Sequence, residues 1–331
     1  MRPRISPAAA KAAAFAAAVT RVFCALTLED ASLHNGAWLC ALLGGALAVP
    51  TLCAMAHLRR GMASWRVSGM ILLPGSLLSA ASALGMLGHS ASFLALDRLH
   101  TALLLLPLVP LVLRGLWLNG DAVGASARVW LKAFPWMLLL LFAVQFRYFR
   151  LDWLFPLLGN GGSCIIRGAL RAAAGFTGCL SLLFFAEEAI DARETLRIHL
   201  AAVISVAALL AIHLMLMPAS AAPLTRIERL DGLLTNGRVP VSLQLPMAIT
   251  WFIPLIVLAN VETLRCALIL SHCARLNGPA AIIAATLGAF FLALMGVSEG
   301  IVGLEYDLII AFVAVEGAIR KGAWRKCARS G

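Results

Sequence analysis

Long apolar stretches separated by short connectors fill almost the whole of this 331-residue sequence. Hydrophobic residues make up 61% of the chain and charged residues only 13%, whereas a soluble domain carries about 25% charged residues. A helix needs about 20 apolar residues to cross the hydrocarbon core of a bilayer. We therefore expect an all-α, polytopic membrane protein with about ten spans and no separate extramembrane domain.

The apolar stretches predict ten spans, which form a single domain over residues 1–331. The predicted spans cover residues 8–28, 37–58, 67–87, 99–118, 129–146, 163–186, 198–217, 239–261, 276–298 and 301–319. Five spans fall in a first repeat of about 8–146 and five in a second of about 163–319. Because five is odd, the second repeat enters the membrane inverted relative to the first, as in many secondary transporters.

Basic residues in the connectors predict the orientation, because cytoplasmic loops carry an excess of Lys and Arg. With the N-terminus inside, the inner segments hold eighteen of the 27 basic residues and the outer segments hold eight, while Arg21 lies within the first span. Both termini are therefore expected in the cytoplasm. Topology also accounts for the net charge of +11, so nucleic acid is not an expected partner.

The two longest connectors carry apolar residues that favour the membrane surface. Residues 147–162 include Trp153 and Phe155, and residues 218–238 include Ile227 and Leu230 at helical spacing among charges. Such amphipathic segments lie in the interface between lipid and water. Both connectors are therefore predicted to rest against the bilayer.

No catalytic or metal-binding pattern stands out. The eight cysteines are scattered without a CxxC spacing, so neither a zinc site nor a disulfide framework is expected. Nothing resembles a nucleophile with its base, a phosphate loop or a metal tetrad. We expect neither enzymatic activity nor a cofactor.

The segment from 152 to 185 resembles the B-subunit permeases of bacterial spore germinant receptors, a branch of the amino acid/polyamine/organocation transporter superfamily with a LeuT-like fold. The residues that match the family pattern are Leu154, Pro156, Gly159, Gly161, Gly168, Ala169, Leu170, Phe176 and Gly178. Weaker similarity covers 30–45 and 228–252. Unlike that family, the first predicted span contains neither glycine nor proline.

The resemblance implies a germinant-sensing, permease-like subunit in a bacterial cell or spore inner membrane. Such a subunit binds a small molecule, here expected to be an amino acid, and works beside a membrane-bound A subunit and a lipoprotein C subunit. Two alternatives stay open at this point. One is a secondary amino-acid transporter that works by alternating access, and the other is a scaffold subunit that binds no ligand.

By the same resemblance, the ligand site lies at mid-membrane between the first, third, sixth and eighth spans. The candidate substrate-binding residues are Thr20, Arg21, Ser79, Ser82, Gly175, Phe176, Thr177, Gly178, Trp251 and Asn260. Gly175 and Gly178 favour either an unwound segment that faces ligand or close packing of helices.

Arg21 is the one basic residue well inside a predicted span, where a charge costs about 2.5–3.5 kcal/mol on insertion scales. It is expected to meet a ligand carboxylate, to pair with a carboxylate such as Glu299, or to reach the outer interface near Leu28. His213 is either a proton relay or a packing residue. Glu299, Glu305 and Asp307 form either a cation site or a solvated loop.

Overall fold

The computed structural model describes residues 5–27, 31–58, 69–94, 101–117, 120–145, 149–154, 161–186, 190–216, 241–295 and 307–317. Regular secondary structure in these ranges is entirely helical, which confirms the predicted class. The α-helices are α1 (Pro7–Thr27), α2 (Ala37–Leu58), α4 (Leu72–Leu94), α5 (Thr101–Trp117), α6 (Gly120–Gln145), α7 (Gly162–Leu180), α8 (Ala192–Leu216), α10 (Val241–Cys273), α11 (Gly278–Leu294) and residues 307–317. Short 3₁₀ segments are η1 (Ala31–Gly36), η3 (Gly69–Ile71), η5 (Leu151–Leu154) and η6 (Ser181–Phe185).

Each of the ten predicted spans overlaps one of these helices. Among the described residues, six helices are long and apolar enough to cross a membrane. Several boundaries differ from the prediction, and two differ most. Helix α6 begins at Gly120, ahead of its predicted start at 129, and α10 continues to Cys273, beyond its predicted end at 261. With 33 residues, α10 is about 50 Å long, more than the roughly 30 Å of hydrocarbon requires.

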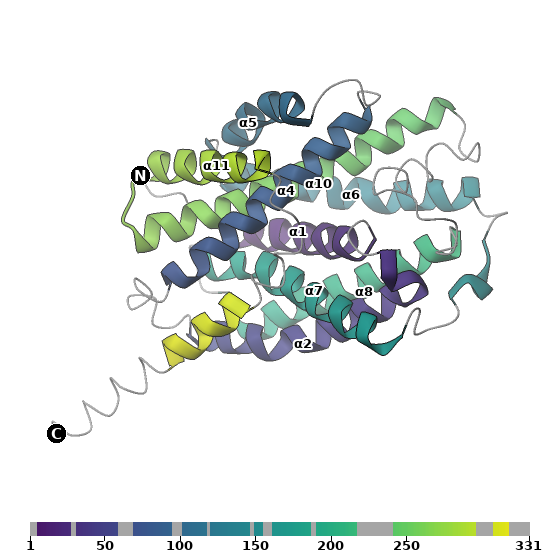
Figure 1. The fold of residues 1–331 in the computed structure, drawn as a ribbon, viewed down its shortest axis with the longest axis horizontal. Coiled ribbons are helices and arrows are strands. Elements are labelled where there is room, and N and C mark those ends of the chain that lie inside the picture. The colour runs from purple at the N-terminus through teal and green to yellow at the C-terminus, as the bar shows by residue number, and fades with distance from the viewer. Residues whose placement is uncertain are drawn as a thin grey trace.

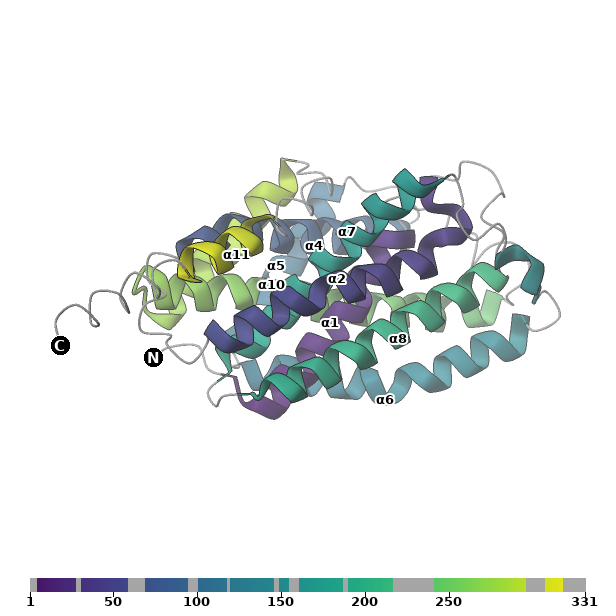
Figure 2. The same cartoon turned by 90° about the horizontal axis from the view of Figure 1, so that it is seen from below.

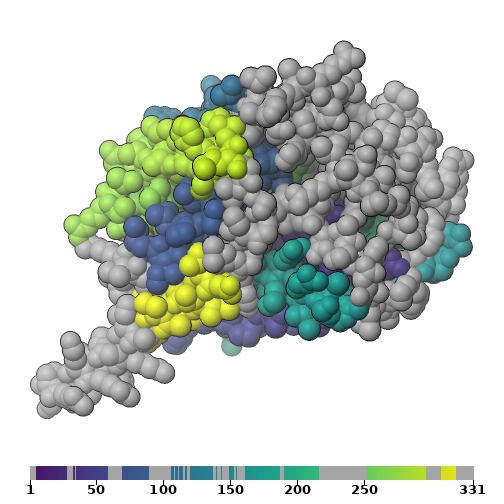
Figure 3. Space-filling model, in the orientation of Figure 1, coloured from purple at the N-terminus to yellow at the C-terminus, as the bar shows by residue number. Residues whose placement is uncertain are grey.

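Helix α1 lies in the middle of the bundle (Figure 1). It contacts α6, α7, α8 and α10, while α4, α5 and α11 lie on one side of it and α2, α7 and α8 on the other. Seen from below, α2 and α8 cross the face nearest the viewer (Figure 2). On the face seen in Figure 3, residues 307–317 lie next to α4. The first span is therefore enclosed by protein.

The composition of α1 explains its central place. Its first half is rich in alanine, and most of the helix is buried. Small side chains let helix backbones approach closely. In a membrane, helices associate through such close packing because lipid tails are as apolar as the side chains. At the contact with α6, a Cβ added to Gly124 would lie only 2.3 Å from the Cβ of Ala9. Close packing thus fixes α1 against its neighbours.

The membrane-surface predictions fall mostly outside the described residues. Within the first connector, η5 places Leu151 at the surface with 63% of it exposed, beside the ion pair of Arg150 and Asp152. The predicted surface helix in 218–238, as well as Glu299 and Glu305, lies outside the described ranges. The division into two inverted repeats stays a prediction.

Candidate functional site

Polar side chains gather in the core where α1, α4, α7 and α10 meet. The membrane-crossing parts of α1, α7 and α10 are more than four-fifths buried, whereas those of α2 and α8 are less than half buried. A polar group in such a core needs a partner, because water is absent and an unpaired group is costly. The polar residues at this junction are therefore the candidates for ligand recognition.

Arg21 lies inside this junction with only 1% of it exposed. Its Nη1 donates a hydrogen bond of 3.0 Å to Oγ of Ser82 on α4. On the other side, α7 comes close because Gly175 has no side chain. A Cβ at Gly175 would lie 3.4 Å from Cγ of Arg21 and 2.8 Å from Cγ2 of Val22. The alternative in which Arg21 reaches the outer interface is therefore wrong.

Ser82 belongs to a row of serines on α4. Ser76, Ser79 and Ser82 follow at intervals of three residues and are all buried, so they lie along one side of the helix. Among the described residues, Oγ of Ser79 has no hydrogen-bond partner. A buried hydroxyl without a partner is unusual in a folded protein, and it marks this part of α4 as a place where a polar ligand can bind.

Several of the other predicted residues make hydrogen bonds within their own helices. Thr20 donates to the carbonyl of Ala16, and Thr177 donates to that of Ala173, both over 2.8 Å. Asn260 donates from Nδ2 to the carbonyl of its own helix one turn earlier, at 3.0 Å. Its Oδ1 has no partner among the described residues. Asn260 therefore retains an acceptor for a ligand.

Phe176 points towards α8. Its ring lies edge-on against that of His199, with centroids 5.2 Å apart, and His199 in turn contacts the carbonyl of Gly45 on α2 at 2.8 Å. Phe176 thus packs α7 against α8. Trp251 lies in α10, but its side chain is outside the described part of the structure.

Helix α7 stays α-helical through Gly175 and Gly178 and changes to a 3₁₀ helix at Ser181. The predicted unwound segment is therefore not found at Gly175–Gly178, and the 3₁₀ turn lies at the C-terminal end of the helix. Gly175 follows the packing alternative, because α1 occupies the space of its missing side chain. The carbonyl of Gly178 accepts a 2.6 Å hydrogen bond from Oγ of Ser181, at the point where the helix changes.

A second buried charged group lies further along the same junction, and it is absent from the residues predicted from sequence. Glu262 and Arg265 of α10 form an ion pair with 2.7 Å between Oε2 and Nη2. Arg265 is one of the eighteen basic residues assigned to the predicted inner segments; that assignment is wrong, because Arg265 lies within α10 and its side chain is only 3% exposed. The signal that could have found the pair is the spacing of three between opposite charges in an otherwise apolar segment.

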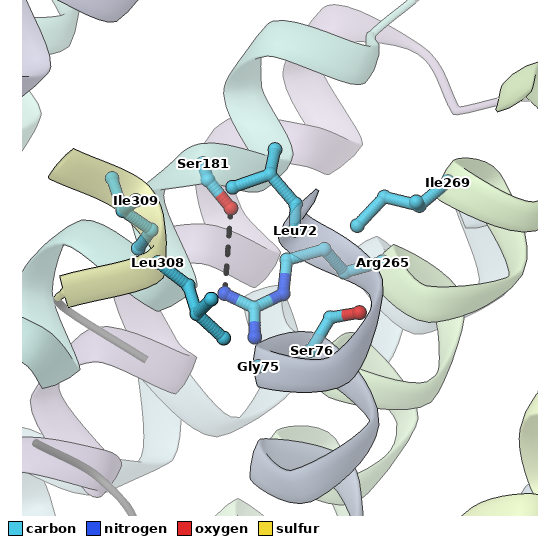
Figure 4. Close-up of a pocket in the computed structure, with 8 residues that line it drawn as sticks. All are labelled: Leu72, Gly75, Ser76, Ser181, Arg265, Ile269, Leu308 and Ile309. Atoms are coloured by element: carbon cyan, nitrogen blue, oxygen red, sulfur yellow. Dashed lines mark hydrogen bonds between the residues drawn. The ribbon is translucent and has the colours of Figure 1, made fainter. Parts of the chain in front are cut away.

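A small cavity opens beside Arg265 (Figure 4). It has a volume of about 10 Å³, room for about one water molecule. Its polar lining consists of Arg265, Ser181 and Ser76, and its apolar lining includes Leu72, Ile269 and Leu308. Ser76 and Ser82 are six residues apart, about 9 Å along a helix, so the row of serines joins this cavity to Arg21.

The remaining polar predictions have structural explanations. His213 lies edge-on against Phe23 at a centroid distance of 5.7 Å, which supports its packing role. Glu194, in the first turn of α8, forms an ion pair with Lys11 of α1. Asp307 is exposed at the start of the helical residues 307–317.

The fold is similar to that of a known transporter. The chain superposes with a TM-score of 0.66 on Mhp1, a nucleobase-cation-symport-1 family transporter solved in a closed conformation with bromovinylhydantoin bound. The match covers 94% of this chain and 76% of Mhp1 at 12% sequence identity. No family model matches the sequence, and neither does any curated protein. The chain is therefore a multi-pass membrane protein with a LeuT-like transporter fold.

Proposed function

We propose that this protein binds an amino acid at the junction of α1, α4, α7 and α10 and reports its presence as the permease-like sensing subunit of a membrane receptor. The observation that carries the proposal is the burial of the Arg21 guanidinium among hydroxyl groups in the centre of a transporter fold. The similarity of residues 152–185 to germinant-receptor permeases supports the receptor role.

A carboxylate is the ligand group that suits Arg21. A guanidinium presents its N–H groups in a planar fork that matches the two oxygens of a carboxylate, and such charge-assisted hydrogen bonds are among the strong ones. Oγ of Ser79 and Oδ1 of Asn260 offer further hydrogen-bonding groups on the neighbouring helices. We assign Thr20, Phe176, Thr177, Gly178 and Trp251 to the surroundings of this site.

The first span supports sensing in preference to transport. Transporters of this general plan bind substrate where helices are discontinuous, but α1 is one unbroken helix without glycine, and its one proline, Pro7, is its first residue. In a sensor, ligand needs only to shift the population of helix arrangements towards one that partner subunits detect. The partners in this proposal are a membrane-bound subunit and a lipoprotein subunit. The excess of basic residues in the predicted inner connectors supports an orientation with both termini in the cytoplasm, in a bacterial cell membrane or spore inner membrane.

Secondary transport by alternating access is the second candidate, and the similarity to the Mhp1 fold favours it. The two candidates differ in a measurable quantity. A transporter accumulates labelled amino acid inside sealed proteoliposomes, whereas a sensor binds it without accumulation. A scaffold subunit does neither, although it still assembles with its partners.

The test uses the full chain reconstituted in lipid and a panel of the twenty radiolabelled L-amino acids. We expect one member to bind, and we expect Arg21→Gln to weaken that binding at least tenfold. Arg150→Gln is the matched control, because Arg150 is 59% exposed at the surface. Binding by Arg21→Gln with wild-type affinity would refute the proposed site.

A companion experiment tests the receptor role. We expect deletion of the gene in its native host to abolish germination with the amino acid that binds, while uptake of that amino acid by the cells stays unchanged. Loss of uptake together with germination would favour the transporter. Normal germination after deletion would refute the sensing role.

A further inference from the structure

Helices α6 and α8 carry the same pattern of side chains on their exposed faces. In each helix, two basic residues four positions apart are followed by two exposed apolar residues. The α6 stripe consists of Arg128, Lys132, Trp136 and Leu139, and the α8 stripe consists of Arg193, Arg197, Leu200 and Ile204. All eight residues are exposed, and the exposed fractions of the four apolar ones range from 58% to 74%. Because residues three or four positions apart lie on one side of a helix, each stripe is a continuous surface.

Both stripes begin at the same end of the bundle. Helices α6 and α8 both pack against α1, and the first turn of each binds the beginning of the chain. In α6, Asp121 accepts a 2.6 Å hydrogen bond from Oγ of Ser6, and in α8, Glu194 pairs with Lys11 of α1. Figure 2 shows the starts of α6 and α8 near the start of α1. The basic residues of the two stripes therefore lie on the same side of the membrane.

The four basic groups of the stripes form no ion pair with any residue in the described ranges. The carboxylates at this end of the bundle have other partners. Asp121 accepts two hydrogen bonds from Ser6, although the first basic residue of the α6 stripe also attracts it. Asp191 accepts a 2.7 Å hydrogen bond from the backbone N–H of the next residue, and Glu194 pairs with Lys11. The stripes therefore present positive charge that an external anion can neutralise.

The stripes are placed at the depth where a phospholipid changes from polar to apolar. Arg128 and Arg197 come directly before the spans predicted at 129–146 and 198–217, at the level of the headgroups. Lys132 lies about 6 Å further along α6. Its side chain points back towards the start of the helix, so its ammonium group can reach the same level. The exposed apolar residues of each stripe then lie at the depth of the acyl chains.

We propose that each stripe binds one anionic phospholipid, with the phosphate between the two basic side chains and an acyl chain along the two apolar ones. Hydrogen bonds from a charged donor to a phosphate are among the strong ones. Inorganic phosphate would match only the basic half of a stripe, whereas a phospholipid matches both halves. This inference does not depend on the proposed recognition of an amino acid.

The position of the stripes gives bound lipid a structural consequence. Helices α6 and α8 both contact α1, the helix that carries Arg21. A lipid on each stripe neutralises the charge at the start of these two helices. We therefore expect anionic lipid to stabilise the arrangement of α6, α1 and α8.

The experiment is native mass spectrometry of the full chain in detergent, with phosphatidylglycerol or with phosphatidylcholine of the same acyl chains. We expect two tightly retained phosphatidylglycerol molecules per wild-type chain and no tightly retained phosphatidylcholine. Each of the double variants R128Q/K132Q and R193Q/R197Q should retain one. Affinity at the altered stripe should fall about thirtyfold, taking about 1 kcal/mol for each basic residue near an anionic headgroup.

Two control variants separate a defined site from net charge. R150Q/R275Q also removes two exposed basic side chains, but from positions outside both stripes, and we expect it to retain two lipids. R128K/K132R keeps both charges of the α6 stripe and should retain two as well. Loss of one lipid from R150Q/R275Q would show that net charge governs retention and would overturn the proposed stripes.

The comparison of the two lipids on the wild type needs no substitution, so it holds even if a variant misfolds. Equal retention of phosphatidylglycerol and phosphatidylcholine would overturn the inference, and so would undiminished retention of phosphatidylglycerol by both double variants. Inorganic phosphate in excess should leave the bound lipid in place. Displacement of the lipid by phosphate would show a site for soluble anions and would overturn the assignment to phospholipid.

Discussion

Substitution of Gly44 by alanine tests the packing that holds α2 against α7. A Cβ at Gly44 would lie 2.5 Å from the carbonyl oxygen of Ala169 and 2.5 Å from the Cβ of Ala172. Non-bonded heavy atoms are most stable about 3.5–4.0 Å apart. Both obstacles are backbone or Cβ atoms that cannot rotate away, so α2 must move outwards by about 1 Å. Overpacking of this kind costs about 1–3 kcal/mol.

Gly85→Ala on α4 is the matched control, because no atom lies within 4 Å of the added Cβ. Alanine is about 1 kcal/mol more favourable than glycine inside a helix, so this substitution should leave stability unchanged or raise it. The two glycine-to-alanine changes thus have opposite expected signs.

The assay is thermal unfolding of the purified proteins in the same detergent, followed by tryptophan fluorescence. We expect Gly44→Ala to lower Tm by about 2–6 °C, taking about 2 °C per kcal/mol for a chain of this size. A Tm for Gly44→Ala equal to that of the wild type or higher would refute the backbone-to-backbone packing of α2 on α7.

Three further perturbations test the charged groups. Glu262→Gln should destabilise the protein by about 3–5 kcal/mol because it removes one partner of a buried ion pair, whereas E262Q/R265Q, which removes both charges, should cost less; equal losses in denaturant unfolding would contradict this reasoning. Lys11→Glu should cost less than about 1 kcal/mol, since the Lys11 and Glu194 side chains are 33% and 44% exposed. Adding Glu194→Lys should restore the loss, and failure of this rescue would show that the pair is not energetically coupled. Hydrogen bonds from the hydroxyl and backbone N–H of Ser6 lower the pKa of Asp121, in the first turn of α6, below its ordinary 3.8. A carboxyl with a lowered pKa stabilises the fold above its unfolded-state pKa and loses this effect as the pH falls through its folded-state pKa. The Tm advantage of the wild type over Asp121→Asn at pH 7 should therefore shrink as the pH falls below 3.8, and an advantage that stays undiminished at the lowest pH at which the protein is folded would contradict the assignment.

The order and number of helices could be predicted from hydrophobicity because the bilayer imposes a minimum length on each apolar stretch. Helix ends could not be predicted as well, because charged residues at a boundary look the same whether they face water or a partner inside the bundle. Helix α6 illustrates this at its start, where Asp121 binds Ser6 of the segment that leads into α1. That partner is 115 residues away in sequence, beyond the reach of any local pattern.

The glycines of α7 show which part of the site depended on tertiary contacts. The sequence allowed either unwinding or close packing at Gly175, because both need a residue without a side chain. The structure selects packing there, since Val22 of α1 fills the space. The helix changes to 3₁₀ form only at its C-terminal end, where the hydroxyl of Ser181 donates to the carbonyl of Gly178. A serine in a helix commonly bonds to its own backbone, so its presence alone did not predict a change of helix type.

Glu262 and Arg265 show why a buried ion pair escapes a reading based on hydrophobicity. When each charged residue is considered alone, the apolar stretch is predicted to end at 261. The residues that follow are then predicted to form a cytoplasmic connector. Removing Arg265 from the inner segments lowers their count by one residue, which leaves the orientation prediction unchanged. Yet the two charges lie within one helical turn and neutralise each other. The free energy of burying the pair is therefore lower than the sum for two separate charges. Opposite charges three residues apart beside an apolar stretch are therefore best considered as one neutral unit before a predicted span is ended.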